Sequence, residues 1–259
     1  MKPANAPIGI YDSGMGGLTV RQAVCRLLPE ESVIYLGDGK NCPYGSRTVE
    51  EIRQLSIEAV EYLRSLGCKL VVVACNTATA AAIDHLRATY PTMPIVGMEP
   101  AVKPACLHTK SRVVGVLATE RSLDGELFRR TAAKYGADIE VLTTAGKGVV
   151  ELVEADKERT PEAVETVCRA IRPMLERGAD QIVLGCTHYP FLLPALEEAA
   201  AGFEVTFVDP SEAVARRVRQ LLDENGLRAE TGHRPTYRFE TFADESYRQR
   251  LEQKAVDTK

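Results

Sequence analysis

Two cysteines occupy equivalent places in the sequence, each after a short apolar run that predicts a buried strand. Cys75 follows the run at 70–74, and Cys186 closely follows the run at 181–184. A helical segment is expected after each cysteine, and the positive end of a helix dipole lowers a thiol pKa from its usual value of about 8.5. Two such thiols on opposite faces of a carbon atom could invert it without a cofactor, because one removes a proton while the other donates one.

Polar residues beside both cysteines could support proton transfer at carbon. Asp12 is expected near Cys75, and His188 lies two residues after Cys186. Each could accept the proton of its thiol or orient the thiol. Removal of an α-proton leaves a planar carbanion, whose carboxylate needs hydrogen-bond donors. The candidate donors are Ser13, Asn76, Thr77 and Thr187.

Two loops carry further candidate ligand contacts. The glycine-rich run at 12–19 follows the first predicted strand, and its backbone amides could hold a carboxylate or phosphate, or form only a tight turn. It does not match the dinucleotide-binding fingerprint, because Thr19 stands where the third glycine is required. Tyr44, in the loop at 42–45, could contact a ligand or pack the loop. The sequence leaves both alternatives open at each loop.

The elements that must position these residues alternate between short apolar runs and amphipathic segments. Strands are expected at Ile8–Tyr11, Ser32–Leu36, Leu70–Ala74, Ile95–Gly97, Val113–Leu117, Glu140–Leu142, Gln181–Leu184 and Thr206–Val208. Helices are expected, among others, at Val49–Leu66, Ala78–Tyr90, Leu123–Tyr135 and Pro161–Arg177. Near-continuous apolar strands separated by such helices are typical of an α/β fold with a parallel sheet covered on both faces.

The two halves of the chain resemble each other. The run at 8–13 is similar to 114–119, and the run at 71–77, which contains Cys75, is similar to 182–188, which contains Cys186. The shared order favours an internal duplication. We therefore expect two pseudo-symmetric α/β domains, each a mostly parallel sheet flanked by helices, with the active site in the cleft between them. The first domain is expected at 1–97 plus 210–259 and the second at 98–209. Each would present one cysteine at the carboxyl end of a strand, where open α/β sheets bind ligands.

Composition excludes several other classes of protein. The 259 residues carry a formal net charge of −4 without a long basic run, which argues against a nucleic-acid partner. Seven scattered cysteines without a CxxC predict neither a disulfide framework nor a zinc site, and no HxH or HExxH pattern predicts another metal. No signal peptide is evident, and no apolar run approaches the roughly 20 residues that span a bilayer. A cytoplasmic protein with no membrane partner is expected.

Four motifs in this sequence closely resemble those of the glutamate racemases, in matching order. They are Asp12-Ser13-Gly14-x-Gly16-Gly17-Leu18-Thr19, Pro43-Tyr44-Gly45, Ala74-Cys75-Asn76-Thr77-Ala78 and Leu184-Gly185-Cys186-Thr187-His188-Tyr189-Pro190. The resemblance implies two α/β domains with the active site between them, and activity without pyridoxal phosphate or metal. It also implies a homodimer, with glutamate as the small-molecule substrate and D-glutamate supplied for peptidoglycan synthesis.

The resemblance also assigns roles to residues of this chain. Cys75 and Cys186 match the catalytic pair, and the auxiliary polar groups beside the thiols match Asp12, His188 and Glu154. The positions that match contacts with the amino acid are Asp12, Ser13, Tyr44, Gly45, Asn76, Thr77, Thr119, Thr187 and His188.

Two segments depart from the pattern of these racemases. Lys40-Asn41-Cys42 stands where the family often has an Ala-Arg pair, and Glu120-Arg121-Ser122 follows Thr119 where a second threonine is usual. Ser122 could supply the hydroxyl of that threonine. These departures bear on substrate affinity and on regulation by cell-wall precursors, whereas the four motifs that carry the chemistry are intact.

Three other functions are compatible with parts of the sequence. A racemase for aspartate, or one of broader specificity, would use the same thiol pair with a shallower pocket. A non-catalytic amino-acid-binding protein would have no need of both cysteines with their polar companions. A thiol redox protein usually has adjacent cysteines or a CxxC, which this chain lacks.

Overall fold

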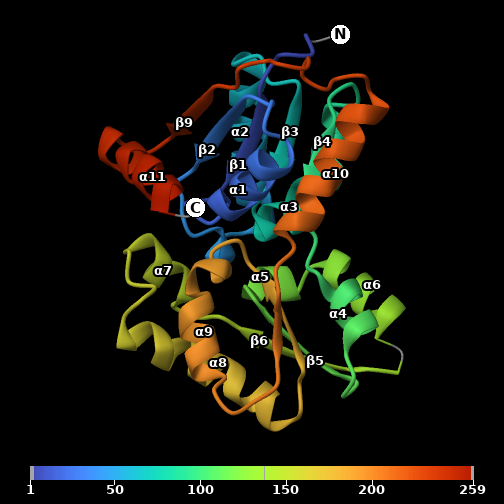
Figure 1. Cartoon of the computed structure of the whole chain (residues 1–259), viewed down its shortest axis with the longest axis vertical. Coiled ribbons are helices and arrows are strands. Elements are labelled where there is room, and N and C mark those ends of the chain that lie inside the picture. Colours follow the sequence, from blue (N-terminus) through green and yellow to red (C-terminus); the bar gives the residue numbers. More distant parts are fainter. Residues whose placement is uncertain (1–2, 137, 258–259) are drawn as a thin grey trace. The chain divides into compact units, whose positions relative to one another are not determined.

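The computed structural model describes residues 3–136 and 138–257, and the chain forms two compact units (Figure 1). The first unit comprises Met1–Met98 and Ser211–Lys259, and the second comprises Glu99–Pro210. Each unit is a parallel sheet with helices packed against it. The predicted fold class, α/β with two helix-flanked parallel sheets, is therefore confirmed.

The first unit is built on a five-stranded sheet in the order β4-β3-β1-β2-β9, with every adjacent pair parallel. Its strands are β1 (Ile8–Asp12), β2 (Val33–Gly37), β3 (Leu70–Val73), β4 (Ile95–Gly97) and β9 (Tyr237–Thr241). Its helices are α1 (Leu18–Leu27), α2 (Val49–Ser65), α3 (Asn76–Thr89), α10 (Ser211–Glu224) and α11 (Glu245–Asp257), with a short 3-10 helix η1 (Tyr44–Ser46).

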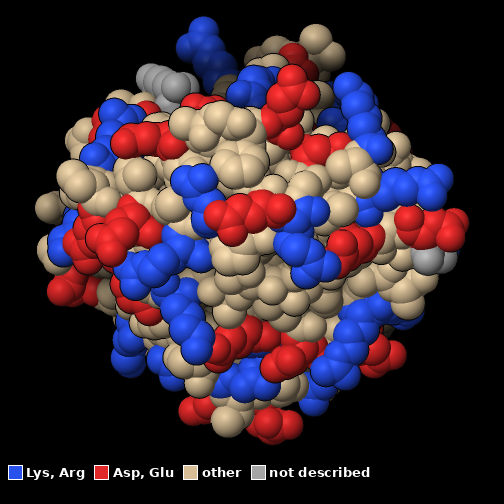
Figure 2. All heavy atoms as spheres, turned by 90° about the horizontal axis from the view of Figure 1, so that it is seen from below, with Lys and Arg blue, Asp and Glu red and all other residues tan. Residues whose placement is uncertain are grey.

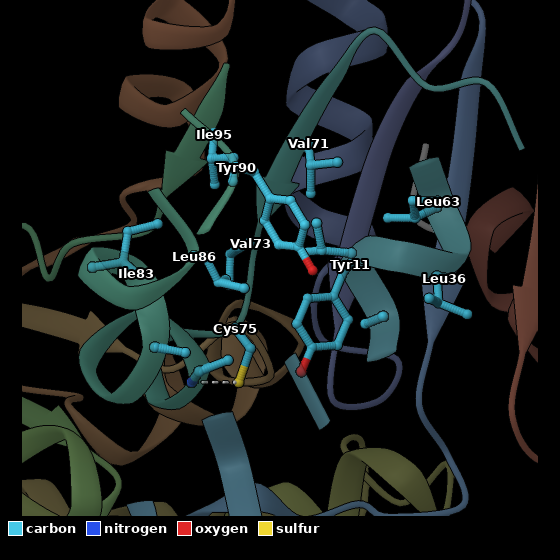
Figure 3. Packing of buried hydrophobic residues seen from close by; sticks show 14 of the residues in the cluster. Tyr11, Leu36, Leu63, Val71, Val73, Cys75, Ile83, Leu86, Tyr90 and Ile95 are labelled. Carbon is cyan, nitrogen blue, oxygen red and sulfur yellow. Dashed lines mark hydrogen bonds between the residues drawn. The ribbon is translucent and has the colours of Figure 1, made fainter. Parts of the chain in front are cut away.

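Helices cover this sheet in pairs. On one face, side chains of α2 and α3 pack with Tyr11, Leu36, Val71 and Val73 in a buried apolar cluster (Figure 3). Alternate residues of a strand point to opposite faces. The intervening strand residues therefore lie toward α1 and α10, which pack against each other, while α11 packs on β9 (Figure 1).

The second unit is built on a four-stranded parallel sheet in the order β6-β5-β7-β8. Its strands are β5 (Val113–Ala118), β6 (Glu140–Ala145), β7 (Gln181–Gly185) and β8 (Thr206–Val208). Its helices are α4 (Val102–His108), α5 (Glu120–Leu123), α6 (Glu126–Tyr135), α7 (Val149–Glu154), α8 (Pro161–Glu176) and α9 (Leu193–Ala199), with a 3-10 helix η2 (Tyr189–Leu192). Helix α4 packs with α6, and α8 packs with α7 and α9.

The order of strands supports the internal duplication. When β1–β4 are matched in sequence with β5–β8, the first sheet reads β4-β3-β1-β2 and the second reads β8-β7-β5-β6, which is the same order. Strand β9 is an addition at the β2 edge of the first sheet. Because β3 matches β7, the strands that precede Cys75 and Cys186 are equivalent members of the two sheets.

All eight predicted strands are present, with ends that differ by at most three residues. The helix predicted at Pro161–Arg177 is present as α8, where the Thr160 side chain accepts a hydrogen bond from the Ala163 amide and Pro161 begins the helix. The helix predicted at Leu123–Tyr135 is present over Glu126–Tyr135, but its predicted start is wrong, since α5 ends at Leu123 and α6 begins at Glu126. Gly125 has extended backbone angles there and caps α6, so the helix cannot continue through it.

A buried ion pair ties distant segments of the first unit together. The Lys69 ammonium lies 2.5 Å from a Glu31 carboxylate oxygen, and both side chains are almost fully buried. The other Glu31 oxygen accepts the Ala229 amide, from the segment that joins α10 to β9. Breaking a buried pair leaves an uncompensated charge, so this contact anchors the C-terminal part of the unit.

Among the described residues, no helix is both long and apolar enough to cross a membrane. On the face seen in Figure 2, Lys and Arg side chains alternate with Asp and Glu side chains, without a large area of one sign. This face lacks the concentrated positive charge that binding to a phosphate backbone requires.

Candidate active site

Cys75 lies at the carboxyl end of the first sheet, as the sequence predicts. It is the N-cap residue of α3, and its sulfur accepts a hydrogen bond from the Ala78 amide at 3.5 Å (Figure 3). The thiol also donates to the Ser13 hydroxyl at 3.4 Å, and only 4% of the residue is exposed. A backbone amide and the N-terminus of a 14-residue helix both favour a thiolate at this sulfur.

Asp12 ends β1 and is completely buried. One of its carboxylate oxygens accepts the Gly14 amide at 2.9 Å. A side chain at Gly17 would place its Cβ 2.7 Å from the Cβ of Asp12, closer than real Cβ contacts, so the loop needs glycine there. The glycine-rich run is thus a tight turn folded around the Asp12 carboxylate, and its ligand contacts stay a prediction.

Asn76 is the first residue of α3 and is 3% exposed. Neither its amide nitrogen nor its amide oxygen has a hydrogen-bond partner among the described residues. Leaving a buried polar group without a partner costs roughly 1–3 kcal/mol. A polar ligand would satisfy both atoms, which fits the predicted role of Asn76. The neighbouring Thr77 is equally buried.

Tyr44 begins η1 and is 1% exposed. Its hydroxyl donates to a carboxylate oxygen of Asp38 at 2.7 Å, so this group is used within the protein. Contact between Tyr44 and a ligand would therefore involve its ring or backbone. Gly45, the next residue, is half-buried.

The second unit brings together a thiol, an imidazole and a carboxylate. The sulfur of Cys186 lies 3.7 Å from Nδ1 of His188, and Nε2 of His188 lies 2.7 Å from a carboxylate oxygen of Glu154. Cys186 and His188 are buried, while the Glu154 side chain is 17% exposed. A carboxylate bound to one imidazole nitrogen fixes the tautomer and stabilises a proton on the ring. The chain of contacts can therefore move a proton to or from the sulfur.

The helical segment expected after Cys186 is present, but it begins as a 3-10 helix and not as an α-helix. Strand β7 ends at Gly185, and the chain then forms a tight turn in which the Tyr189 amide donates to the Cys186 carbonyl at 3.1 Å. The 3-10 helix η2 follows, and α9 begins only at Leu193. Cys186 is therefore not the N-cap of an α-helix as Cys75 is, and the imidazole of His188 can stabilise its thiolate.

Two other predicted contacts lie in the second unit. Thr187, between Cys186 and His188, is 1% exposed. Thr119 caps α5, because its hydroxyl oxygen accepts a hydrogen bond from the Ser122 amide. The hydroxyls of Thr119 and Ser122 lie 2.8 Å apart. Although Glu120-Arg121-Ser122 replaces the usual second threonine, Ser122 thus places a second hydroxyl beside that of Thr119.

Two buried tyrosines beside the thiols received no role from the sequence. Burial, followed by the charge of Cys75, raises the pKa of Tyr11. Burial, followed by the charge of Cys186, likewise raises the pKa of Tyr189. The signal was available for Tyr189, which belongs to the motif that follows Cys186. For Tyr11 it was hidden, because its position inside an apolar strand is typical of a core residue.

Four other cysteines of the chain differ from this pair. Burial raises the pKa of the Cys25 and Cys106 thiols, which keeps them protonated and unreactive. Cys68 and Cys106 are buried, whereas Cys25 and Cys168 are partly exposed.

Comparison with known proteins identifies the family. Residues 18–218 match the model of the Asp/Glu/Hydantoin racemase family. The chain belongs to this family. It is 47% identical to the glutamate racemase of Roseiflexus sp. over 85% of this chain and 81% of that protein. Both the family prediction and the enzyme class, an amino-acid racemase, are confirmed.

Solved structures agree with this assignment. The glutamate racemase of Francisella tularensis, in complex with D-glutamate, has a TM-score of 0.84 at 26% identity and covers 98% of this chain and 94% of its own. That of Escherichia coli, in complex with L-glutamate and the activator UDP-MurNAc-ala, has a TM-score of 0.85 at 29% identity, with coverages of 98% and 95%. Both relatives bind a small amino acid, which supports a small-molecule substrate for this family.

Proposed function

We propose that this protein interconverts L- and D-glutamate without a cofactor, with Cys75 and Cys186 as acid and base on opposite faces of the α-carbon. The observation that carries the proposal is the equivalence of the two thiols. Each follows the matching strand of its sheet, is buried, and contacts polar groups that can stabilise a thiolate. One thiolate removes the α-proton, and the opposite thiol donates a proton to the other face.

The first unit supplies a thiolate site and carboxylate recognition. The Ala78 amide and the N-terminus of α3 stabilise the negative sulfur of Cys75, while Ser13 orients it. The buried amide of Asn76 offers its nitrogen as a donor and its oxygen as an acceptor to the substrate. Asp12, held by the Gly14 amide, is the nearby carboxylate that can receive a proton or bind the amino group.

The second unit supplies the opposite thiol by another arrangement. Glu154 polarises His188, and the imidazole exchanges a proton with Cys186. Each thiol can then serve as base or acid, which a reversible racemase requires because the roles exchange with direction. Thr187 and the paired hydroxyls of Thr119 and Ser122 are polar groups for substrate binding in this unit.

Glutamate is favoured over aspartate as the substrate. The curated relatives named glutamate racemase are 43–47% identical to this chain over most of its length. The solved structure of an aspartate racemase from Picrophilus torridus is only 18% identical, with a TM-score of 0.54, so it shares the fold alone.

We further propose, from the family resemblance, that the enzyme acts in the cytoplasm as a homodimer and supplies D-glutamate for peptidoglycan synthesis. A sedimentation measurement of the purified protein tests the dimer. Depletion of the protein in its host, with and without added D-glutamate, tests the role in the cell wall. Growth that fails without D-glutamate and recovers with it is the expected result.

Single cysteine variants test the two-thiol mechanism. Cys75→Ala and Cys186→Ala should each abolish racemisation, because each removes the only acid or base on one face of the substrate. Cys25→Ala in the first unit and Cys106→Ala in the second are matched controls and should retain activity. Circular dichroism of L- or D-glutamate follows the reaction. Substantial turnover by either catalytic variant would refute the mechanism.

A further inference from the structure

Asp38 is a buried carboxylate that the reaction, as described so far, does not use. It follows β2 directly and is completely buried. One oxygen accepts the Tyr44 hydroxyl at 2.7 Å, and the Asn41 amide nitrogen lies 3.1 and 3.0 Å from the two oxygens. Within 4.0 Å of this carboxylate, the described part of the chain places no Lys, Arg or His nitrogen. The hydrogen bonds of Tyr44 and Asn41 therefore hold it.

The carboxylate sets the direction of a chain of hydrogen bonds. A carboxylate only accepts, so Tyr44 must donate its hydroxyl proton to Asp38. The Tyr44 oxygen then accepts the Tyr11 hydroxyl, which lies 2.9 Å away. Tyr11 belongs to β1, and its hydroxyl lies on the same side of the sheet as the thiol of Cys75 (Figure 3). Asp38 thus fixes the Tyr44 ring against the strand that ends in Asp12.

Backbone contacts of Asp38 strengthen the same link. Its amide donates to the Asp12 carbonyl at 3.0 Å, and its carbonyl accepts the Asn41 amide at 3.2 Å. The Arg47 side chain in turn donates to the Asn41 carbonyl at 2.8 Å. Through its backbone and its side chain, Asp38 joins the end of β1 to the loop at 38–47, which carries the candidate substrate contacts Tyr44 and Gly45.

Asn41 belongs to the segment where the sequence departs from other glutamate racemases. In this structure its amide supplies the second donor to the Asp38 carboxylate. The departure therefore supports the loop by a hydrogen bond from a neutral amide to the Asp38 carboxylate. Because Tyr44 and Asn41 share one carboxylate, displacement of either side chain would loosen the other.

We propose that Asp38 is a positioning residue for glutamate binding, acting through the Tyr44 hydroxyl to fix the Pro43-Tyr44-Gly45 turn against β1. The proposal rests on the proposed function, because it assumes that this turn contacts the substrate. A fixed turn binds the substrate in the ground state and the transition state alike, so its loss raises KM more than it lowers kcat.

A double-mutant cycle tests this role. Asp38→Asn removes the charge but keeps the size of the side chain, and we expect KM for glutamate to rise about five- to thirtyfold, with kcat within about threefold of wild type. Tyr44→Phe should raise KM similarly. In the Tyr44→Phe background, Asp38→Asn should change KM less than about twofold, because the hydroxyl through which it acts is gone.

The chain offers a matched control for loss of a tyrosine–carboxylate hydrogen bond. The Tyr62 hydroxyl donates to Glu240 at 2.9 Å, in the same unit but away from the turn. Glu240→Gln should leave KM within about twofold of wild type. Thermal unfolding of every variant accompanies the kinetics. If Asp38→Asn does not fold, Asn41→Ala removes the other donor and should raise KM in the same direction.

Additive effects of Asp38→Asn and Tyr44→Phe on KM would overturn the proposal, as would an unchanged KM or a loss confined to kcat. Calorimetric titration with glutamate separates this proposal from the proposed function. A wild-type protein that binds glutamate without racemising it would refute the function, and the same cycle would then be read in Kd. A wild-type protein that does not bind glutamate would overturn both.

Discussion

The Cys186–His188–Glu154 contacts predict a defined loss of activity when the carboxylate loses its charge. In the wild-type protein, Nε2 of His188 lies 2.7 Å from a carboxylate oxygen of Glu154. Glu154→Gln keeps an oxygen that can accept a hydrogen bond from Nε2 but removes the negative charge. Hydrogen bonds to charged groups contribute about 1.5–3 kcal/mol and neutral ones about 0.5–1.5 kcal/mol. The variant should therefore lose about 1–2 kcal/mol of transition-state stabilisation, which is roughly five- to thirtyfold in kcat/KM.

Enantiomers have equal free energies, so the equilibrium constant is one and kcat/KM must fall by the same factor in both directions. We expect this equality when L- and D-glutamate are assayed separately by circular dichroism. Glu162→Gln is the control, since this exposed carboxylate pairs with Lys157 in the same unit and should leave activity within about twofold. A kcat/KM within twofold of wild type for Glu154→Gln would refute the proposed role of the carboxylate.

Three further predictions follow from contacts in the first unit. Cys75→Ser should exchange the α-proton of one enantiomer faster than it inverts it, because serine is a poor acid; racemisation equal to wild type would contradict this. Glu31→Gln should lower the free energy of unfolding in urea by about 3–5 kcal/mol, since the Lys69 ammonium loses its buried partner; an unchanged value would show that the pair does not stabilise the unit. Burial raises the pKa of Tyr11 and Tyr44 above 10.0, the usual value of a tyrosine. Above pH 10 each hydroxyl therefore ionises in the unfolded chain but not in the folded one, and the free energy of unfolding falls by about 1.4 kcal/mol per pH unit for each tyrosine; below that pH neither lowers it. In urea titrations above pH 10, the free energy of unfolding should fall less steeply with pH for Tyr11→Phe than for wild type. Equal pH slopes for the two proteins would show that Tyr11 does not contribute.

Much of the fold could be predicted because it rests on local patterns. Apolar runs such as Leu70–Val73 are buried on both faces of a parallel sheet, and amphipathic segments separate them. Strand β9 was not predicted, because polar and apolar residues alternate in it and it has no continuous apolar run. It lies at an edge of the sheet, and its first two residues are exposed. The break between α5 and α6 escaped because apolar periodicity continues across Gly125, while the backbone does not.

Prediction of the candidate site succeeded where the chemistry follows a strand directly. Cys75 and Cys186 both lie at the carboxyl ends of strands. Cys75 is the second residue after β3, and Cys186 is the first residue after β7. The contacts between distant segments could not be derived from spacing. Asp38 binds Tyr44 only because the loop folds back, and the contact of Glu154 with His188 depends on how α7 packs beside the turn after β7. The resemblance to the family predicted Glu154, whereas the role of Asp38 follows only from the folded structure.

The central claim is that this protein moves the α-proton of glutamate between two faces without a cofactor. The most direct test is proton NMR of L-glutamate in deuterated buffer with protein freed of metals and cofactors, followed by chiral analysis of the product. The account predicts loss of the α-proton signal together with appearance of deuterated D-glutamate. An α-proton signal that persists while the protein remains folded and saturated with glutamate would contradict it.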